Sequence, residues 1–306
     1  MNKNNIKGSL ILLLASLLWG LAFVVQRDAS SKIKPFAFNG LRSLLGAAVI
    51  MLFLLVKKKV DKKPIFTLTR EYLKNAIKGG VICGTALLIS VNLQQYGIAV
   101  YENGVAAEAR SGFLTALYVI LVPIASVILK KRVPVLVWIA VAIATVGIYF
   151  LCLTGGFTSI YLGDVLMFSC ALTFTVHIMA IDAFCEKVGG PQLSVFQFTF
   201  CGIISIILSF VFECGFSTST VYSALPQILY MGVFSSGAAY TLQIVGQKYA
   251  EPAIASISMS FESVFAALGA VVIVGTVPKP REILGCVLVF VAIITAQIPE
   301  FLKKDN

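Results

Sequence analysis

Ten apolar runs, each long enough to cross a bilayer, follow one another with short polar interruptions between Gly8 and Gln297. A helix needs about 20 mostly apolar residues to span the hydrocarbon core. The expected spans are 8–26, 36–56, 76–98, 104–129, 134–153, 162–184, 191–212, 223–246, 253–275 and 282–299. The pattern therefore predicts an all-α membrane protein with ten transmembrane helices and short loops.

The distribution of basic residues predicts how these spans are oriented. Of the 24 Lys and Arg residues, 17 fall in segments on the side of the two chain ends and five on the other side, while Arg42 and Arg110 lie within spans. Basic residues are enriched in cytoplasmic loops. We therefore expect a multi-pass protein of the cell membrane, surrounded by lipid, with both termini in the cytoplasm.

Composition and motifs narrow the function. Hydrophobic residues make up 58% of the chain and charged residues 12%, whereas soluble domains carry about 25% charged residues. In a soluble protein the net charge of +10 would indicate nucleic-acid binding, but here we interpret it as an orientation signal and expect no nucleic-acid partner. The seven cysteines form no C-x-x-C pair, and no P-loop or hydrolase motif occurs. We expect no metal, no cofactor, no catalytic residues and no enzyme activity.

The two halves of the chain resemble each other. Segments 8–35 and 163–191 each contain a glycine, an apolar helix with an aromatic residue (Trp19 or Phe174), a charged turn and a proline that opens the next helix. Because each half holds five spans, an odd number, the second copy must be inverted in the membrane. The expected five-helix repeats are 8–153 and 162–299. Inverted repeats are a recurring transporter architecture, with the substrate site near the midplane.

Four separated stretches are similar to a known family. LLLASLLWGLAFVVQRDASSKIKPFAFNGLRSLLGA, which includes Trp19, Asn39 and Arg42, resembles the opening of an EamA-domain protein of the drug/metabolite transporter superfamily. Residues 110–123, 177–184 and 225–275 resemble later parts of the same family. The resemblance implies a ten-helix fold of two inverted repeats, and export or exchange of small metabolites, amino acids or drugs.

Two arginines are expected at similar depth. Arg42 and Arg110 each lie about six residues into a span that starts from the outer face, or roughly 9 Å deep at the rise of an α-helix. Guanidinium groups match carboxylate and phosphate oxygens in pairs, so the two could bind an anionic substrate together. Alternatively, each could pair with a glutamate or with helix-end carbonyls, and Glu108 could reach Arg42 from a neighbouring helix.

Two further ionisable residues are candidates for proton coupling. Glu262 lies about ten residues into its span, where a carboxyl group tends to be protonated because burial disfavours the charged form. It could couple transport to protons, bind an amine, or tie its helix to a neighbour through a hydrogen bond. His177, the only histidine, could relay protons or contact substrate, or it could be a hydrogen-bonded interior group.

Uncharged polar residues also recur at helical spacing within spans. Ser236, Tyr240, Gln243 and Gln247 form one stripe, and Thr85, Asn92 and Gln95 form another. In lipid such stripes are expected to turn inward, where they line a wet cavity or hold helices together. We expect Tyr240, Gln243 and Asn92 to contact substrate, with Trp19 as a wall of the cavity.

These observations predict a secondary transporter that exports a small molecule by alternating access. Protons are the candidate coupling ion. One alternative is a carrier for a phosphorylated or nucleotide-linked sugar or lipid, which the arginines would also suit. Another is a non-transporting membrane receptor or assembly factor. Substrate, direction, coupling ion and oligomeric state are not determined by the residues.

Overall fold

The computed structural model describes residues 4–61, 64–67, 69–102, 107–152, 160–265 and 279–303, and most of these residues are helical. No strand occurs within these ranges. The helices are α1 (Asn5–Trp19), α2 (Ala22–Ser30), α3 (Pro35–Asp61), α4 (Arg70–Ala99), α5 (Ala107–Ala116), α6 (Tyr118–Ile128), α7 (Val135–Cys152), α8 (Leu162–Val188), α9 (Gly190–Phe212), α10 (Thr218–Ser223), α11 (Leu225–Tyr230), the π-helix η1 (Met231–Ala239), α12 (Tyr240–Tyr249), α13 (Pro252–Met259) and α15 (Pro280–Lys303). The expected all-helical class is confirmed for the described residues.

Within the described residues, eight helical stretches are long and apolar enough to cross a membrane. They are Asn5–Ser30, Pro35–Val60, Arg70–Ala99, Arg110–Ile128, Leu162–Val188, Gly190–Phe212, Leu225–Tyr249 and Pro280–Ile298. The expected fifth span is the shorter apolar helix Val135–Phe150. The expected ninth span, 253–275, is described only as far as Phe265. The count of ten therefore stays a prediction.

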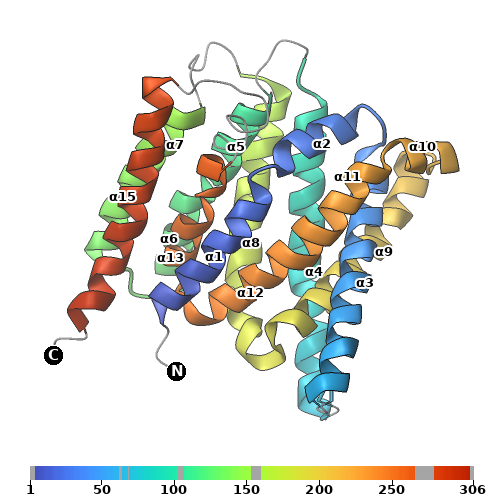
Figure 1. Ribbon diagram of the computed structural model, residues 1–306, viewed down its shortest axis with the longest axis horizontal. Helices are drawn as coiled ribbons and strands as arrows, with labels where there is room; N and C mark the ends of the chain where they lie inside the picture. Colours follow the sequence, from blue (N-terminus) through green and yellow to red (C-terminus); the bar gives the residue numbers. More distant parts are fainter. Residues whose placement is uncertain are drawn as a thin grey trace.

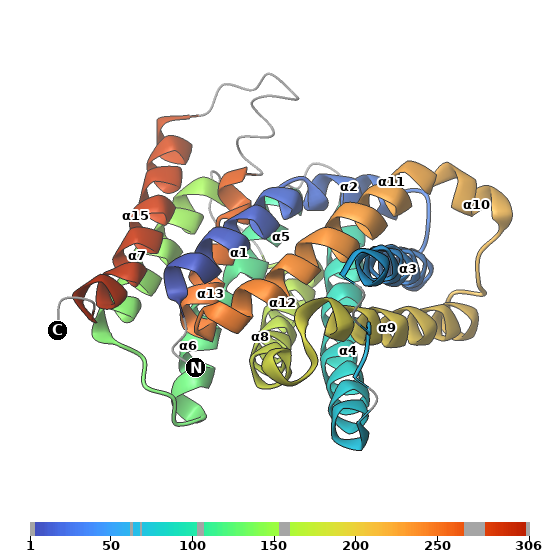
Figure 2. The same cartoon turned by 60° about the horizontal axis from the view of Figure 1, so that its bottom comes forward.

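Helices from the two halves of the chain pack against each other. At one edge of the bundle α7 packs on α15, and at the opposite edge α3 packs on α9 (Figures 1 and 2). Between them, α4 packs on α8, and α1 packs on α12 and α13. The first residues of α1 and the last of α15 lie at the same end of the bundle, where α3 ends and α4 begins (Figure 1).

Small residues allow these close approaches. A Cβ added to Gly40 on α3 would lie 2.6 Å from Ile206 Cδ1 on α9, and one added to Gly202 on α9 would lie 2.7 Å from Leu44 Cγ on α3. Helices in lipid associate through such close packing, because burial from lipid gives no hydrophobic driving force. The paired glycines therefore explain why α3 and α9 lie in direct contact.

The start of α3, the helix that carries Arg42, is held by a buried acid from another part of the chain. Glu213 follows α9, and its two carboxylate oxygens accept hydrogen bonds from the backbone N–H groups of Phe36 (2.9 Å) and Ala37 (3.1 Å). The Tyr96 hydroxyl also donates to this carboxylate, at 2.7 Å. A carboxylate at a helix N-terminus satisfies free donors and complements the helix dipole. Glu213 thereby ties α3 to the end of α9.

Several spans are interrupted near the middle of the bundle. The first is broken between α1 and α2, the fourth between α5 and α6 at Leu117, and the ninth after α13 at Ser260 and Phe261. The eighth contains η1, whose wider turn is of a kind found frequently at functional sites. Irregular backbone at membrane depth is tolerated where it is buried in protein or lines a cavity.

Candidate functional site

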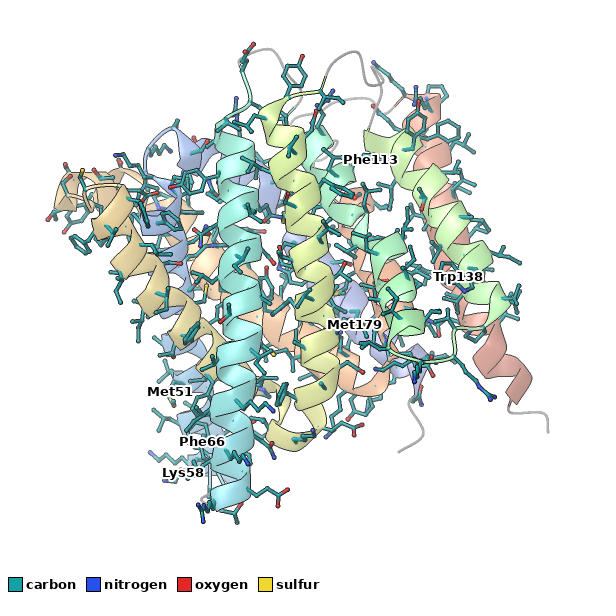
Figure 3. All side chains as sticks on the ribbon, turned by 180° about the vertical axis from the view of Figure 1, so that it is seen from behind. Met51, Lys58, Phe66, Phe113, Trp138 and Met179 are labelled. Carbon is teal, nitrogen blue, oxygen red and sulfur yellow. The ribbon has the colours of Figure 1, made fainter. Side chains whose placement is uncertain are left out.

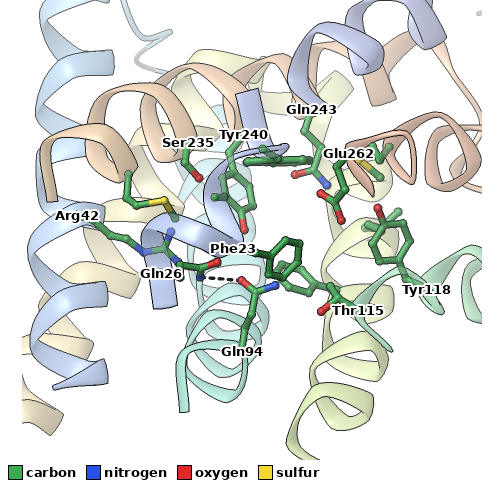
Figure 4. A pocket seen from close by; sticks show the side chains of 16 residues that line it. Phe23, Gln26, Arg42, Gln94, Thr115, Tyr118, Ser235, Tyr240, Gln243 and Glu262 are labelled. Atoms are coloured by element: carbon green, nitrogen blue, oxygen red, sulfur yellow. Dashed lines mark hydrogen bonds between the residues drawn. The ribbon is translucent and has the colours of Figure 1, made fainter. Parts of the chain in front are cut away.

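A cavity of about 50 Å³ lies among these interrupted helices. Polar and aromatic side chains in its lining are Trp19, Phe23, Gln26, Arg42, Gln94, Thr115, Tyr118, Phe174, Ser235, Tyr240, Gln243 and Glu262 (Figure 4). They come from both halves of the chain, so the cavity exists only where the halves meet.

Each interruption places a side chain in the cavity wall. Trp19 ends α1, Tyr118 begins α6, Glu262 follows the turn after α13, and Ser235 lies in η1. A break changes the direction of a helix and releases its side chains from the regular 3.6-residue repeat. The breaks are therefore the local feature that gathers these residues around one space.

Arg42 forms one wall of the cavity and is only 2% exposed. Its Nε donates to Asn39 Oδ1 at 2.7 Å. Among the described residues, no carboxylate lies within 4 Å of the guanidinium, and its terminal amino groups donate no hydrogen bond to the protein. The side chain of Glu108, the expected partner, lies outside the described residues. A buried cation without a protein anion is costly, so the guanidinium is suited to bind an anionic ligand.

Asn39 and Asn92 hold Arg42 in place from behind. The Asn39 amide nitrogen donates to Asn92 Oδ1 (2.9 Å) and to the Val91 carbonyl (3.0 Å). Asn92 in turn donates to the Leu88 carbonyl (2.8 Å) and to Ser205 Oγ (3.3 Å). Asn92 is absent from the cavity lining. The structure thus places this residue as a support that links α3, α4 and α9, and not at the wall where we expected it.

Glu262 lies across the cavity from Arg42 (Figure 4). Its carboxyl group faces the Tyr118 hydroxyl, and the Gln243 side chain lies beside it (Figure 4). Glu262 is 6% exposed and Gln243 is 2% exposed. The Gln243 side-chain oxygen is buried without a hydrogen-bond partner among the described residues. This wall therefore offers acceptors for a cationic or hydrogen-bonding group, opposite the guanidinium wall.

Aromatic rings close the space between these walls. The Trp19 and Tyr240 rings meet edge to face at 4.8 Å between centroids. His177 lies behind Tyr240, with ring centroids 6.1 Å apart, and does not line the cavity. Its Nε2 lies 3.1 Å from Gln197 Oε1, and its Nδ1 has no partner among the described residues. The structure thus places Trp19 and Tyr240 in the cavity and His177 in a layer outside it.

Arg110 lies apart from the cavity. Its Nε donates to Asp164 Oδ1 at 3.0 Å, and its Nη2 donates to the other carboxylate oxygen. The same carboxylate accepts hydrogen bonds from the Tyr101 hydroxyl (2.7 Å) and the Tyr161 backbone N–H (3.0 Å). Burial, with this hydrogen bond, raises the pKa of Tyr101, which lies between spans. The expectation that Arg110 joins Arg42 around one ligand is not met, because Asp164 already neutralises Arg110.

The two polar stripes also divide between roles. Tyr240 and Gln243 reach the cavity, whereas Gln247 donates to the Ile178 carbonyl and Gln95 to the Gln26 carbonyl. Thr85 is exposed. One stripe therefore serves both the cavity and the contacts between helices.

Sequence analysis missed two amides in the wall. Gln26 donates to Gln94 Oε1 at 3.0 Å, and both residues line the cavity. A signal existed, since each is an amide within or at the edge of an apolar run. The predicted stripe on the third span includes Gln95, which follows Gln94 and faces the neighbouring helix instead of the cavity.

Together, the apolar helices, the interrupted spans and the polar internal cavity define a multi-pass membrane protein with an architecture typical of transporters. The EamA-like transporter family matches residues 6–153 and 161–296. The chain therefore belongs to this family and is a membrane transporter, which confirms the resemblance noted in the sequence.

Individual relatives agree with this assignment. The chain is 27% identical over 288 residues to an uncharacterized transporter of Archaeoglobus fulgidus, covering 94% of this chain and 84% of that protein. It is 24% identical over 292 residues to the uncharacterized transporter YwfM of Bacillus subtilis, covering 94% and 92%. A crystal structure with 18% sequence identity matches 95% of this chain and 96% of its own, with a TM-score of 0.74, and supports the fold alone.

Proposed function

We propose that this protein is a secondary exporter of a small metabolite, such as an amino acid or a drug, that works by alternating access around the Arg42–Glu262 cavity. The observation that carries the proposal is a buried guanidinium without a carboxylate partner among the described residues, facing a carboxyl group across the cavity. A zwitterion satisfies both walls, with its carboxylate on Arg42 and its amine on Glu262 and Gln243.

The exporter is built from two inverted five-helix repeats that form ten spans. The packing supports this arrangement at three of the five counterpart pairs, since α3 meets α9, α7 meets α15, and α6 meets α13. The other two pairs exchange partners, with α4 packed on α8 and α1 packed on α12. A two-fold axis in the membrane plane produces such pairs. Trp19 and Phe174, which occupy matching positions in the two halves, both line the cavity.

Both termini lie in the cytoplasm and the protein resides in the cell membrane, in this proposal. The described basic residues at the end of α3 and the start of α4 lie at the same end of the bundle as the start of α1 (Figure 1). Retention of basic residues on the cytoplasmic side supports that orientation. Labelling of a Ser219→Cys variant from outside intact cells tests it, because Ser219 lies in α10 at the other end of the bundle.

Glu262 couples export to protons in this proposal. It binds the substrate amine when ionised and releases it when protonated, because substrate and proton compete for one carboxylate. Protons that enter down an inward-directed gradient then exchange for substrate that leaves. Transport by Glu262→Gln and by the unaltered protein is measured across a pH gradient. An equal response of the two proteins would disprove this role of Glu262 and leave the exporter proposal standing. His177→Gln is the matched control, since His177 lies outside the cavity.

Reconstituted protein tests the transport proposal. Proteoliposomes are loaded with a labelled panel of zwitterionic amino acids, matched amines without the carboxylate and matched acids without the amine. We expect transport of zwitterions, with affinity reduced about tenfold to a hundredfold in Arg42→Met, as for loss of a hydrogen bond to a charged group. Equal transport of every panel member by the unaltered protein and Arg42→Met would reject the ligand assignment.

A carrier for phosphorylated or nucleotide-linked compounds is less well supported. A sugar phosphate or a nucleotide-linked sugar carries about two negative charges, which proteins usually bind with several cations. Arg42 is the only Lys or Arg among the described residues that line the cavity. Transport of a nucleotide-linked sugar, included in the same panel, would reverse this preference.

A further inference from the structure

The hairpin formed by α3 and α4 extends beyond the other helix ends on the side of the chain termini (Figures 1 and 3). Its described residues include six exposed basic side chains: Lys57, Lys58, Lys59, Arg70, Lys74 and Lys78. Orientation of the chain explains a basic surface at this end. It does not explain why two of these lysines face a built cavity.

That cavity, with a volume of about 290 Å³, lies apart from the central one. It is lined by Leu54, Lys57, Lys58, Pro64, Ile65, Pro191 and Gln192. None of the described lining residues is acidic, and neither lysine forms an ion pair with a described side chain. Two cations without an ion-pair partner among the described side chains therefore border one hollow.

Packing holds the walls of this hollow in place. Gln192 Nε2 donates to the Ile65 carbonyl at 3.0 Å and so fixes the segment after α3 to the start of α9. The Phe66 and Phe196 rings meet edge to face at 5.7 Å between centroids. Lys58 and Phe66 both lie near the tip of the hairpin (Figure 3). These two contacts join the segment after α3 to α9 beside the cavity.

The depth of the lysines indicates what reaches them. α3 begins at Pro35, and a span of about 20 residues from there ends near Leu54. Lys57 and Lys58 follow within about 6 Å along the helix axis, at 1.5 Å for each residue. This distance matches the headgroup layer, which adds several ångströms on each side of the hydrocarbon core. The two ammonium groups are therefore at the level of lipid phosphates.

An exposed apolar surface continues from the lysines into the membrane. Phe53, one turn before Lys57 on α3, is 54% exposed, and the neighbouring Leu52 is 62% exposed. Residues four apart share a helix face. A lipid whose phosphate lies at Lys57 and Lys58 can lay an acyl chain along Phe53, whereas a free phosphate gains nothing from this surface.

We propose that the cavity at Lys57, Lys58 and the start of α9 binds the headgroup of an anionic phospholipid from the leaflet on the side of the chain termini. The lysines neutralise the phosphate, the first turn of α9 forms the facing wall, and Phe53 contacts an acyl chain. The bound lipid ties α3, the helix that carries Arg42, to α9.

Native mass spectrometry of the detergent-solubilised protein, titrated with phosphatidylglycerol or phosphatidylcholine, tests this site. We expect selective binding of phosphatidylglycerol and about thirtyfold weaker binding by Lys57→Gln/Lys58→Gln, from about 1 kcal/mol for each lysine at a membrane surface. Lys57→Arg/Lys58→Arg should restore binding. Lys74→Gln/Lys78→Gln is the matched control, because it removes the same charge from the same hairpin outside the cavity.

Three outcomes would overturn the proposal. Equal losses in the two glutamine pairs would mean that the hairpin acts only through its diffuse positive potential. Equal binding of the two lipids would mean that the headgroup charge is not recognised. Displacement by inorganic phosphate at matched concentration would assign the site to a soluble anion. Since lipid binding is the readout, none of these results depends on the transport proposal.

Discussion

Arg42 and Arg110 are equivalent in their expected depth in the membrane, but the structure places them in different environments. Both lie about six residues into an expected span, and both are buried, at 2% and 6% exposed. Arg110 meets Asp164 through two hydrogen bonds and shares that carboxylate with Tyr101. Arg42 meets the neutral Asn39, which leaves its positive charge unbalanced by any described side chain.

The difference separates a structural charge from a charge available to a ligand. Both partners of a buried ion pair lose their hydration. Their mutual attraction offsets this free-energy cost only when the geometry of the pair is good. Asp164 provides that geometry for Arg110 and joins α5 to α8 outside the cavity. An amide can orient Arg42 without neutralising it, so the cost of its burial is offset when an anionic ligand binds. Four predictions can break or sharpen this contrast.

The largest effect is expected at Arg110. Arg110→Met leaves Asp164 buried without its cation, and we expect the free energy of unfolding to fall by about 3–5 kcal/mol. Unfolding in mixed micelles with increasing denaturant measures it. The double variant Arg110→Met/Asp164→Leu should recover most of the loss, since it removes both charges. If the double variant is as unstable as the single one, the contribution of Arg110 to stability does not come from its ion pair with Asp164.

The opposite result is expected at Arg42. Arg42→Met removes a buried cation that has no described carboxylate partner, so we expect unchanged or increased thermal stability without substrate. The stabilisation that substrate confers should fall by about 1.5–3 kcal/mol, the usual value for a hydrogen bond to a charged group. Thermal melting in detergent with and without the best substrate of the transport panel measures both quantities. A loss of stability like that of Arg110→Met would remove the distinction between the two arginines.

A smaller effect is expected at Asn39, which positions Arg42. Asn39→Ala should weaken substrate binding about fivefold, corresponding to about 1 kcal/mol for one hydrogen bond. In an Arg42→Met background the same substitution should leave affinity unchanged, because the two residues act as a unit. Titration of the four proteins completes the double-mutant cycle. Additive effects would contradict a positioning role and indicate that Asn39 only stabilises the fold.

An effect of similar size, on stability and not on substrate affinity, is expected at Tyr101. Tyr101→Phe removes one of the hydrogen bonds to Asp164 while the ion pair with Arg110 stays, so we expect a loss of about 1 kcal/mol of stability. Substrate affinity should be unaffected, because this cluster lies outside the cavity. The same melting and titration experiments measure both. A weaker substrate affinity would place the Arg110 cluster in the transport site after all.

Much of the fold could be predicted from the sequence because it depends on local properties. The lengths of the apolar runs indicate a membrane protein, and the motif around Trp19 and Arg42 indicates the family, which is confirmed over both halves. Some site residues could be predicted for the same reason. A charged or aromatic residue within an apolar run, such as Glu262 or Tyr240, must face protein or water, whichever neighbour it meets.

The sequence by itself determined the membrane environment, the helical class, the family and the inventory of buried polar groups. Only the tertiary structure decided which of these groups meet. It paired Arg110 with Asp164, 54 positions away, placed Asn92 behind the wall, and opened the cavity where helices break. Periodicity describes one helix at a time, whereas partners depend on how helices rotate and pack against one another, and this is why two similar arginines acquired different roles.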